Sequence, residues 1–217
     1  SKEKVKDIKN KLKKDKNAEN LPMAEFYFTA VVLPKDENDK PINIYGASKA
    51  AGEREVENIF KDTCQATILR TSGIIGPFGK NFSETMLQLF SDRENVNVIC
   101  DQISSPTSSL RLSFVIWEII KKFSKRNISH TMPKIMHYSD DGICSWYDVA
   151  CKINELAFEN QLIKKKVKIS PISSNQFHEN VKRPKFSKLD SSETHKILNL
   201  KPIHWEESIK SYLKNKK

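Results

Sequence analysis

Short apolar runs alternate with longer helix-forming runs along most of this 217-residue chain. The apolar runs are rich in β-branched and aromatic residues and predict strands at residues 26–33, 66–71, 96–100 and 134–138. The longer runs predict helices at residues 45–61, 82–92, 110–122 and 205–213, and one that Ser145 caps and that reaches about residue 158. Alternating strands and helices favour parallel pairing, because each helix carries the chain back across the sheet. The sequence therefore predicts an α/β fold with a mostly parallel sheet.

A tyrosine and a lysine stand four residues apart at the start of the first predicted helix. Side chains at positions i and i+4 lie on one face of a helix, so the Lys49 ammonium can lie beside the Tyr45 phenol. A phenol ordinarily titrates near ~10, and a neighbouring cation favours its ionised form. The same spacing also arises on solvated helix faces. Small residues on the following turns, however, let this helix approach a neighbour or a cofactor closely. The pattern predicts a group that transfers a proton at neutral pH.

Further short motifs follow in order between about residues 39 and 213. Together with the first they are NIYGASK (43–49), AGE (51–53), LRTS (69–72), GKNF (79–82), TML (85–87), DQ (101–102), SPT (105–107), SWYD (145–148) and RP (183–184). In these motifs the chain resembles the extended short-chain dehydrogenase/reductases, and within them the dTDP-4-dehydrorhamnose reductase type. The resemblance implies a partial Rossmann-type fold, in which a doubly wound, mostly parallel sheet is joined to a smaller mixed α/β substrate-binding region.

The resemblance also implies a division of the chain and a reaction. Residues 1–21 are expected to form a Lys-rich helix or linker, and residues 22–73 the C-terminal part of a dinucleotide-binding domain. Residues 74–217 are expected to bind substrate, with chain crossing back to the cofactor side. Enzymes of this type reduce a dTDP-linked 4-keto-6-deoxy sugar with a hydride from NADPH or NADH, in dTDP-rhamnose and polysaccharide biosynthesis. The expected small-molecule partner is therefore a nucleotide sugar.

The resemblance assigns the catalytic roles to Tyr45 and Lys49, which also contact the cofactor. Tyr45 is expected to protonate the alkoxide that forms at the sugar C4, and Lys49 to hold the nicotinamide ribose and favour the ionised phenol. Thr71 and Ser72 lie at the end of a predicted strand, where ligands gather in open α/β sheets, and are assigned to the cofactor site. Ordinary hydrogen bonding at a strand end is the alternative for these two hydroxyl groups.

Five residues are expected to bind the nucleotide sugar. They are Gly73, Lys80, Asn81, Gln102 and Arg183. The N-termini of helices and nearby cations favour a diphosphate, and an arginine can bind a phosphate through two nitrogens. The alternatives are that Asn81 and Thr107 cap helices and that Arg183 forms a surface salt bridge.

Aromatic residues near the expected site differ from the family pattern. A tryptophan that packs on the sugar usually follows Arg-Thr-Ser, whereas this chain has Gly73, and Phe78 is the candidate that replaces the tryptophan. Core packing is the favoured role for the aromatic residues at the starts of two predicted helices, which are Trp146, Tyr147 and Trp205.

Two further parts of the family pattern are not found in this sequence. The glycines stand at positions 46, 52, 73, 76, 79 and 142, and none of them forms the glycine-rich turn that holds a pyrophosphate. The third catalytic hydroxyl aligns with Ala24, and Thr29 is the nearest candidate. We therefore expect weak cofactor binding by this chain alone, and a homodimer or a partner that supplies the cofactor half. The alternative function is a non-catalytic regulatory or binding subunit of the same superfamily.

The charge, the cysteines and the histidines limit the other classes of protein to which this chain could belong. The net charge of +10 comes mostly from lysines at the two ends, without the interleaved aromatic residues typical of nucleic-acid binding. The four cysteines form no Cys-x-x-Cys pair, and no apolar run approaches the ~20 residues that span a bilayer. A reduced, cytoplasmic protein is expected, without nucleic-acid or membrane partners. The histidines show no metal-ligand spacing, so no metal ligand is predicted, although the resemblance implies that Mg²⁺ can assist.

Overall fold

The computed structural model describes residues 25–29, 41–61, 66–124, 133–177 and 183–216, so the predicted segment at 1–21 lies outside the described residues. The elements are β1 (Glu25–Thr29), α2 (Ile44–Phe60), β2 (Ala66–Arg70), β3 (Ile74–Ile75), α3 (Phe82–Asp92), β4 (Asn95–Ile99), β5 (Ile103–Ser104), β6 (Thr107–Ser108), α4 (Ser109–Ser124), β7 (Ile135–His137), β8 (Cys144–Ser145), α5 (Trp146–Glu159), β9 (Lys168–Ile172), η2 (Ser174–Gln176), α6 (Ser192–Leu198) and α7 (Trp205–Lys214).

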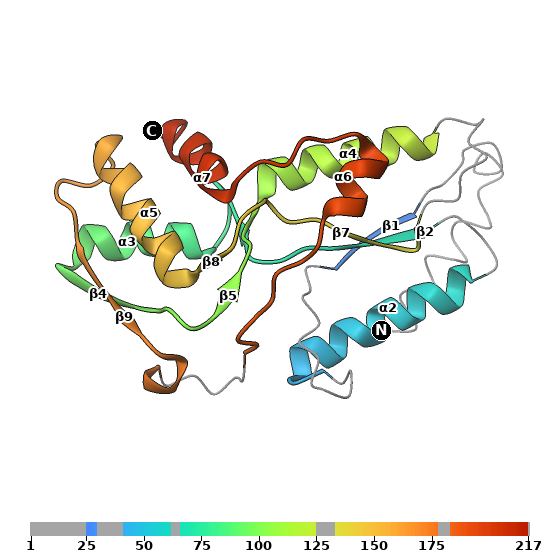
Figure 1. Ribbon diagram of the computed structural model, residues 1–217, viewed down its shortest axis with the longest axis horizontal. Coiled ribbons are helices and arrows are strands. Elements are labelled where there is room, and N and C mark those ends of the chain that lie inside the picture. The colour runs from blue at the N-terminus through green and yellow to red at the C-terminus, as the bar shows by residue number, and fades with distance from the viewer. Residues whose placement is uncertain (1–24, 30–40, 62–65, 125–132, 178–182, 217) are drawn as a thin grey trace.

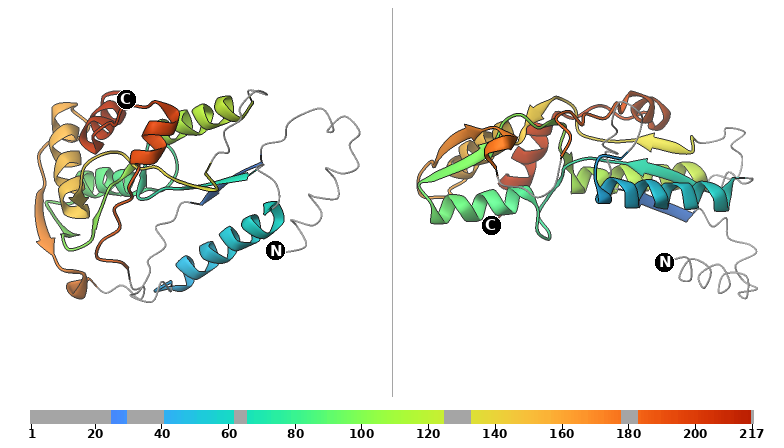
Figure 2. Two further views of the ribbon diagram at one scale, coloured as in Figure 1. Left: turned by 45° about the vertical axis from the view of Figure 1, so that its right-hand side comes forward. Right: turned by 90° about the horizontal axis from the view of Figure 1, so that it is seen from below.

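Three parallel strands form the centre of one α/β unit, which we call the sheet body (Figure 1). Strand β2 lies between β1 and β7, with Ile68 paired to Tyr27 on one side and to Ile135 on the other. Helix α2 covers one face of the sheet, and α4 and α6 cover the other (Figures 1 and 2). The apolar core on the second face consists of Leu69, Val115, Ile119, Met136, Tyr138 and Leu198. The parallel pairing confirms the predicted α/β class.

A second unit, which we call the helical body, packs α3, α5 and α7 around the parallel pair β4 and β9 (Figure 1). Buried apolar side chains from α3, β4, α5 and α7 share one core, which includes Phe90, Val98, Ile153 and Leu213. The partly buried Ile169 of β9 packs against it. Helix α5 begins with the predicted cap. The backbone N–H of Asp148 donates to the Ser145 hydroxyl at 3.1 Å, and the Asp148 carboxylate accepts from the Ser145 N–H at 2.8 Å. This reciprocal pair satisfies two backbone donors at the helix start.

The five predicted helices are all found, with ends within two residues of the predicted ones. The predicted strands also form, although the first begins at Glu25 and residues 30–33 lie outside the described residues. The prediction missed β9, α6 and four two-residue strands. Residues 102–107, where no strand was predicted, contain β5 and begin β6. These short strands depend on partners distant in sequence, so local patterns do not reveal them.

A buried ion pair fixes α2 on the sheet. The Arg70 guanidinium at the end of β2 donates to both carboxylate oxygens of Glu53, from Nε at 2.9 Å and from Nη2 at 2.7 Å. Glu53 is buried, whereas Arg70 remains partly exposed and also lies 3.4 Å from Nε2 of His137. Burial and the neighbouring Arg70 cation hold the pKa of His137 below its ordinary value. Because Glu53 is one turn beyond Lys49, this pair sets the position of the helix that carries Tyr45 and Lys49.

We expect Glu53→Ala to lower the free energy of unfolding by about 2–3 kcal/mol, because it leaves the Arg70 cation partly buried beside His137 without its carboxylate partner. Urea unfolding followed by circular dichroism measures the change. Glu57→Ala, an exposed site on the same helix, is the control and is expected to change the free energy by less than ~0.5 kcal/mol. Equal effects of the two substitutions would contradict a structural role for the ion pair.

Candidate functional site

Tyr45 and Lys49 lie together on the first turns of α2. The Asn43 side chain caps the helix by accepting from the Gly46 N–H at 2.7 Å. The Lys49 Nζ lies 5.3 Å from the centroid of the Tyr45 ring, so the predicted pair shares one face of the helix. Tyr45 is 53% exposed, and Lys49 is half-buried. The phenol is therefore accessible to a ligand, and the ammonium lies beside it.

The N-terminal end of α2 lies on the same side of the molecule as the end of β9 and η2 (Figure 1, and the left view of Figure 2). The turn after β9 in the helical body is thus on the same side of the molecule as the first turn of α2, which carries Tyr45. Ala24, where the third hydroxyl was expected, lies outside the described residues. Thr29, the nearest candidate, is the last residue of β1 and pairs with Arg70.

Thr71 and Ser72 follow β2 and are buried. The Thr71 hydroxyl donates to Oγ1 of Thr107 at 3.0 Å, and the Ser72 hydroxyl donates to the Ser105 carbonyl at 2.6 Å. Both hydroxyl groups therefore form hydrogen bonds within the protein, which is the alternative to cofactor binding that was left open for them. Thr107 does not cap α4 as expected, because its hydroxyl donates to the Ser72 carbonyl at 2.5 Å. Ser108 accepts from the Arg111 N–H at the start of that helix instead.

A cavity of about 450 Å³ opens in the helical body between α3, β4 and the start of α5. It is lined by Gly73, Ile74, Phe82, Thr85, Met86, Leu89, Asn97, Val98, Ile99, Gln102, Trp146, Phe177 and Arg183. Three of the five residues predicted to bind the sugar, Gly73, Gln102 and Arg183, therefore line one cavity. An isolated parallel bridge between Ile103 and Phe186 holds the segment that follows Arg183 beside β5. An apolar cavity with a few polar groups at its wall is typical of a small-molecule site.

Aromatic rings form much of the cavity wall. Phe82 and Trp146 pack with ring centroids 4.6 Å apart and an interplanar angle of 44°. Gly73 has a φ of +48°, and a Cβ at this position would lie 3.3 Å from Cη2 of Trp146. Trp146 therefore packs against the core as expected and also lines the cavity, a role that the sequence did not reveal. Phe78, the candidate replacement for the family tryptophan, is 84% exposed and does not line this cavity.

The other two predicted sugar-binding residues lie outside this cavity. Asn81 caps α3, with its Oδ1 accepting from the N–H groups of Ser83 and Glu84, so the capping alternative is confirmed. Lys80 lines a separate hollow along α3 that also contains Glu84 and Lys216. The structure thus separates Lys80 from Arg183, although the sequence had assigned both to the same ligand.

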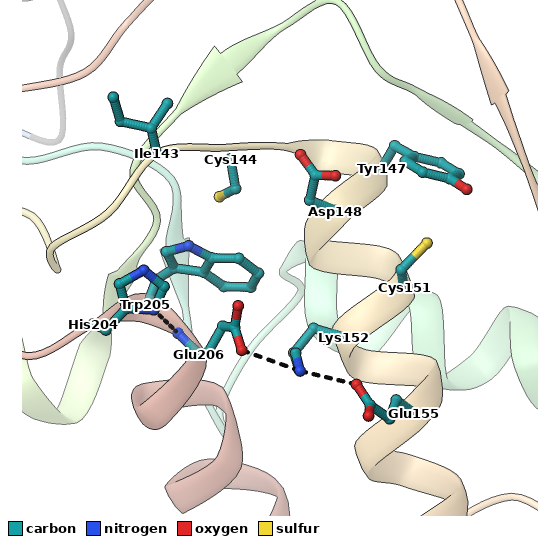
Figure 3. A pocket seen from close by; sticks show the side chains of 10 residues that line it. All are labelled: Ile143, Cys144, Tyr147, Asp148, Cys151, Lys152, Glu155, His204, Trp205 and Glu206. Carbon is teal, nitrogen blue, oxygen red and sulfur yellow. Dashed lines mark hydrogen bonds and ion pairs between the residues drawn. The ribbon is translucent and has the colours of Figure 1, made fainter.

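A further hollow of about 450 Å³ lies between α5 and the start of α7 (Figure 3). Its central cation, Lys152, lies between Glu155 at 2.9 Å and Glu206 at 3.0 Å. These contacts raise the pKa of Lys152. Carboxylates outnumber cations in this hollow, where Asp148, Glu155 and Glu206 face Lys152. The cavity lined by Trp146 has Arg183 and no carboxylate among the described residues of its wall, so it is the better candidate for an anionic ligand.

Within the described ranges, no group of three or more His, Cys, Asp or Glu side chains could hold a metal ion. The same ranges contain no helix that is both long and apolar enough to cross a bilayer. The described cysteines are free: Cys100 and Cys151 are half-buried, and Cys144 is buried.

Comparisons with known proteins identify similar chains. The family described as RmlD substrate binding domain matches residues 30–217. The spore coat polysaccharide biosynthesis protein SpsK of Bacillus subtilis is 35% identical over 182 residues, which are 84% of this chain and 58% of that protein. A dTDP-4-dehydrorhamnose reductase of Aggregatibacter actinomycetemcomitans is 31% identical over 172 residues, which are 79% of this chain and 56% of that protein.

Solved structures agree with these relatives. A crystal structure of dTDP-4-dehydrorhamnose reductase from Bacillus anthracis in complex with NADP has a TM-score of 0.72 and 31% identity, covering 88% of this chain and 65% of that one. The corresponding protein from Clostridium acetobutylicum has a TM-score of 0.70 and 27% identity, covering 87% of this chain and 64% of that one. The chain thus spans less than two thirds of the length of these similar proteins.

We expect Gly73→Ala to lower the free energy of unfolding by about 2–3 kcal/mol. A side chain at positive φ costs ~1–2 kcal/mol, and crowding of Trp146 adds about 1 kcal/mol. Gly79→Ala is the matched control, because Gly79 also has a positive φ of +72° but a Cβ there meets nothing within 4 Å. Urea unfolding and tryptophan emission distinguish the two variants. If both variants lose the same stability with unchanged emission, Gly73 and Trp146 do not pack as described.

Proposed function

This chain belongs to the RmlD substrate binding domain family, and from that premise we propose that it binds a dTDP-linked 4-keto-6-deoxy sugar and takes part in its reduction by a nicotinamide cofactor. The observation that carries the proposal is the cavity that brings together Gly73, Gln102 and Arg183 beside Phe82 and Trp146. Relatives named for this reduction cover the same part of the chain. The product would enter dTDP-rhamnose biosynthesis.

The cavity supplies the two kinds of contact that a nucleotide sugar needs. The planar base would pack against the aromatic wall, since rings stack on flat apolar surfaces. The diphosphate would lie near Arg183, whose guanidinium can donate two parallel hydrogen bonds to phosphate oxygens. Gln102 can donate to or accept from the ligand through its side-chain amide. The sugar would then extend toward the side of the molecule where α2 presents Tyr45.

The proton step would rest on Tyr45 and Lys49. A bound nicotinamide cofactor would supply the hydride for the sugar carbonyl. Tyr45 would donate its phenolic proton to the oxygen at C4 as negative charge develops there. Lys49, with Nζ 5.3 Å from the Tyr45 ring centroid, would favour the resulting phenolate and could donate to a ribose hydroxyl. The exposed phenol fits this role, because the reacting carbonyl must reach it directly.

The residues of this chain fit only one end of a nicotinamide dinucleotide. Tyr45 and Lys49 suit the ribose beside the nicotinamide, whereas none of the six glycines forms the turn that binds a pyrophosphate. A glycine-rich half would therefore have to come from further polypeptide, in the same chain, in a second copy or in a partner. We propose NADPH or NADH as the cofactor and retain Mg²⁺ as a prediction from the family resemblance.

The proposed division of the chain follows from the same scheme. Residues 22–73 would belong to the cofactor side and residues 74–217 to the substrate side. The pairing of β7 with β2 supports the return of the chain to the cofactor side. Thr71 and Ser72 lie between the proposed cofactor side and the proposed substrate side. Their hydroxyl groups form hydrogen bonds within the protein, so a cofactor near them would contact neighbouring atoms more than these hydroxyl groups.

A non-catalytic binding subunit is the second candidate. The observation that favours it is Ala24 at the position of the third catalytic hydroxyl, together with Gly73 at the position of the family's tryptophan. Such a subunit would keep the sugar cavity and would not require the Tyr45 phenol.

We expect dTDP to bind to this chain and Arg183→Ala to weaken the binding by roughly 10- to 100-fold, the loss of charge-assisted hydrogen bonds to a phosphate. Isothermal titration calorimetry measures both affinities. Lys80→Ala, in the separate hollow along α3, is the control and should change the affinity by less than about twofold. If Lys80→Ala weakens binding instead, the diphosphate lies along α3 and the proposed pose is wrong.

Tyr45→Phe separates the two candidate functions. With a glycine-rich cofactor half supplied, we expect this variant to lower the rate of nicotinamide oxidation by the keto sugar about 10²- to 10⁴-fold, because the proton donor is removed. Binding of dTDP should remain unchanged. Tyr147→Phe, which removes a phenol from the hollow in Figure 3, should leave the rate unchanged. Full activity of Tyr45→Phe would exclude Tyr45 as the proton donor.

A further inference from the structure

A short turn after β9 carries one wall of the substrate cavity. Strand β9 ends at Ile172, the helical turn η2 spans Ser174–Gln176, and Phe177 follows it. Phe177 lines the cavity and is 43% exposed, so its ring stands at the edge of the cavity rather than in the core. A side chain so exposed has few core neighbours that fix it, and its position depends on the backbone of the turn.

Asp101, which follows β4, holds this turn. Its Oδ1 accepts from the Ser174 N–H at 2.8 Å and from the Ser174 hydroxyl at 2.5 Å. The side-chain amide of Gln102 donates to the same Ser174 hydroxyl at 3.2 Å. These contacts extend the β4–β9 ladder, whose last bond runs from the Cys100 N–H to the Ile172 carbonyl at 2.9 Å. The turn is thus tied to the strand that forms the floor of the cavity.

A second set of bonds closes the turn on itself. The side-chain oxygen of Gln176 accepts from the Ser173 N–H at 2.9 Å and from the Ser173 hydroxyl at 3.2 Å. The Phe177 N–H donates to the Ser174 carbonyl at 3.2 Å. These bonds hold the turn together, and Ser174 is the residue through which its side chains and backbone bond to the segment after β4.

We propose that Asp101 is a positioning residue for the substrate cavity, which acts through Ser174 to hold the Phe177 ring against the bound nucleotide. The inference rests on the proposed function, since it concerns the same cavity. Asp101 does not line the cavity and would not touch the ligand. Its carboxylate is suited to the task because one oxygen accepts two hydrogen bonds, and bonds to a charged acceptor are about twice as strong as neutral ones.

The charges around Asp101 agree with an ionised carboxylate. The Ser174 hydroxyl holds the pKa of Asp101 below its ordinary value, and the Lys185 cation acts in the same direction. Lys185 belongs to the segment that bonds to β5, where its carbonyl accepts from the Ile103 N–H at 2.8 Å. Asp101 is therefore bonded to the turn that carries Phe177 and also feels the cation of Lys185, two residues after Arg183 of the cavity wall.

A double-mutant cycle with dTDP as the probe tests the inference. We expect Phe177→Ala to weaken dTDP binding about tenfold, as for loss of one stacked ring, and Asp101→Ala to weaken it about three- to tenfold. In the Phe177→Ala background, Asp101→Ala should have no further effect, because the ring that it positions is gone. Asp101→Asn keeps a carbonyl acceptor for Ser174 and should retain affinity within about threefold of wild type.

Controls separate the inference from stability and from the proposed function. Glu94→Ala removes an exposed carboxylate that precedes β4 and pairs with Lys165, and it should leave dTDP binding unchanged. Hydrogen exchange at the Ser174 amide should be faster in Asp101→Ala. Ser174→Ala, which keeps the carboxylate and removes only the hydroxyl donor, should weaken binding in the same way and also lose its effect when Phe177 is absent.

The outcomes are distinct. Wild-type affinity of Asp101→Ala for dTDP overturns the positioning role alone, and so does an effect of Asp101→Ala that persists undiminished in the Phe177→Ala background. No binding of dTDP by the wild-type chain overturns the proposed function and the inference together. Faster exchange at Ser174 with unchanged affinity would show that the turn is held by Asp101 but that its position does not matter to the ligand.

Discussion

Buried hydroxyl groups join the two apolar cores of the molecule, and the rest of the structure depends on this junction. Thr71 and Ser72, which leave the sheet body, bond to Thr107 and Ser105, which lead back from the helical body. A buried hydroxyl without a partner costs about 1–3 kcal/mol, so each of these bonds favours one relative position of the crossing segments. Gly73 follows directly in the chain, and the junction therefore also fixes one wall of the cavity.

The long elements could be predicted because their sequence patterns are local. Helix α3 was predicted with both ends correct, since its apolar residues recur at helical spacing and Asn81 provides a cap. Strand β9 was missed, because the run Lys-Ile-Ser-Pro-Ile contains a proline and alternates poorly. The two-residue strands form only when the junction brings their partners together. What the sequence could not reveal is thus the packing between the two bodies.

The sequence predicted polar residues of the candidate site and missed its aromatic ones. Gln102 and Arg183 are 81 positions apart in the chain and still line one cavity, as their shared assignment to the sugar required. The aromatic wall was missed, because a tryptophan or phenylalanine at a helix start has the same sequence context whether it packs in a core or faces a ligand. Lys80 was assigned to the same ligand but lies in a different hollow. A cation near a helix start can have many different neighbours, and the fold decides which of them it meets.

The exposure of Tyr45 has a consequence for how the chemistry could be completed. Proton transfer to a developing alkoxide is favoured where water is excluded, yet this phenol is 53% exposed on the first turn of α2. The cavity of the helical body supplies binding surface, but neither Tyr45 nor Lys49 is among the residues that line it. In the proposed function, the cover over the phenol would come from the bound sugar, the cofactor and the polypeptide that binds the pyrophosphate. In the proposed scheme the cavity for recognition and the phenol for proton donation lie on separate bodies, and a ligand bound between them would bring them together.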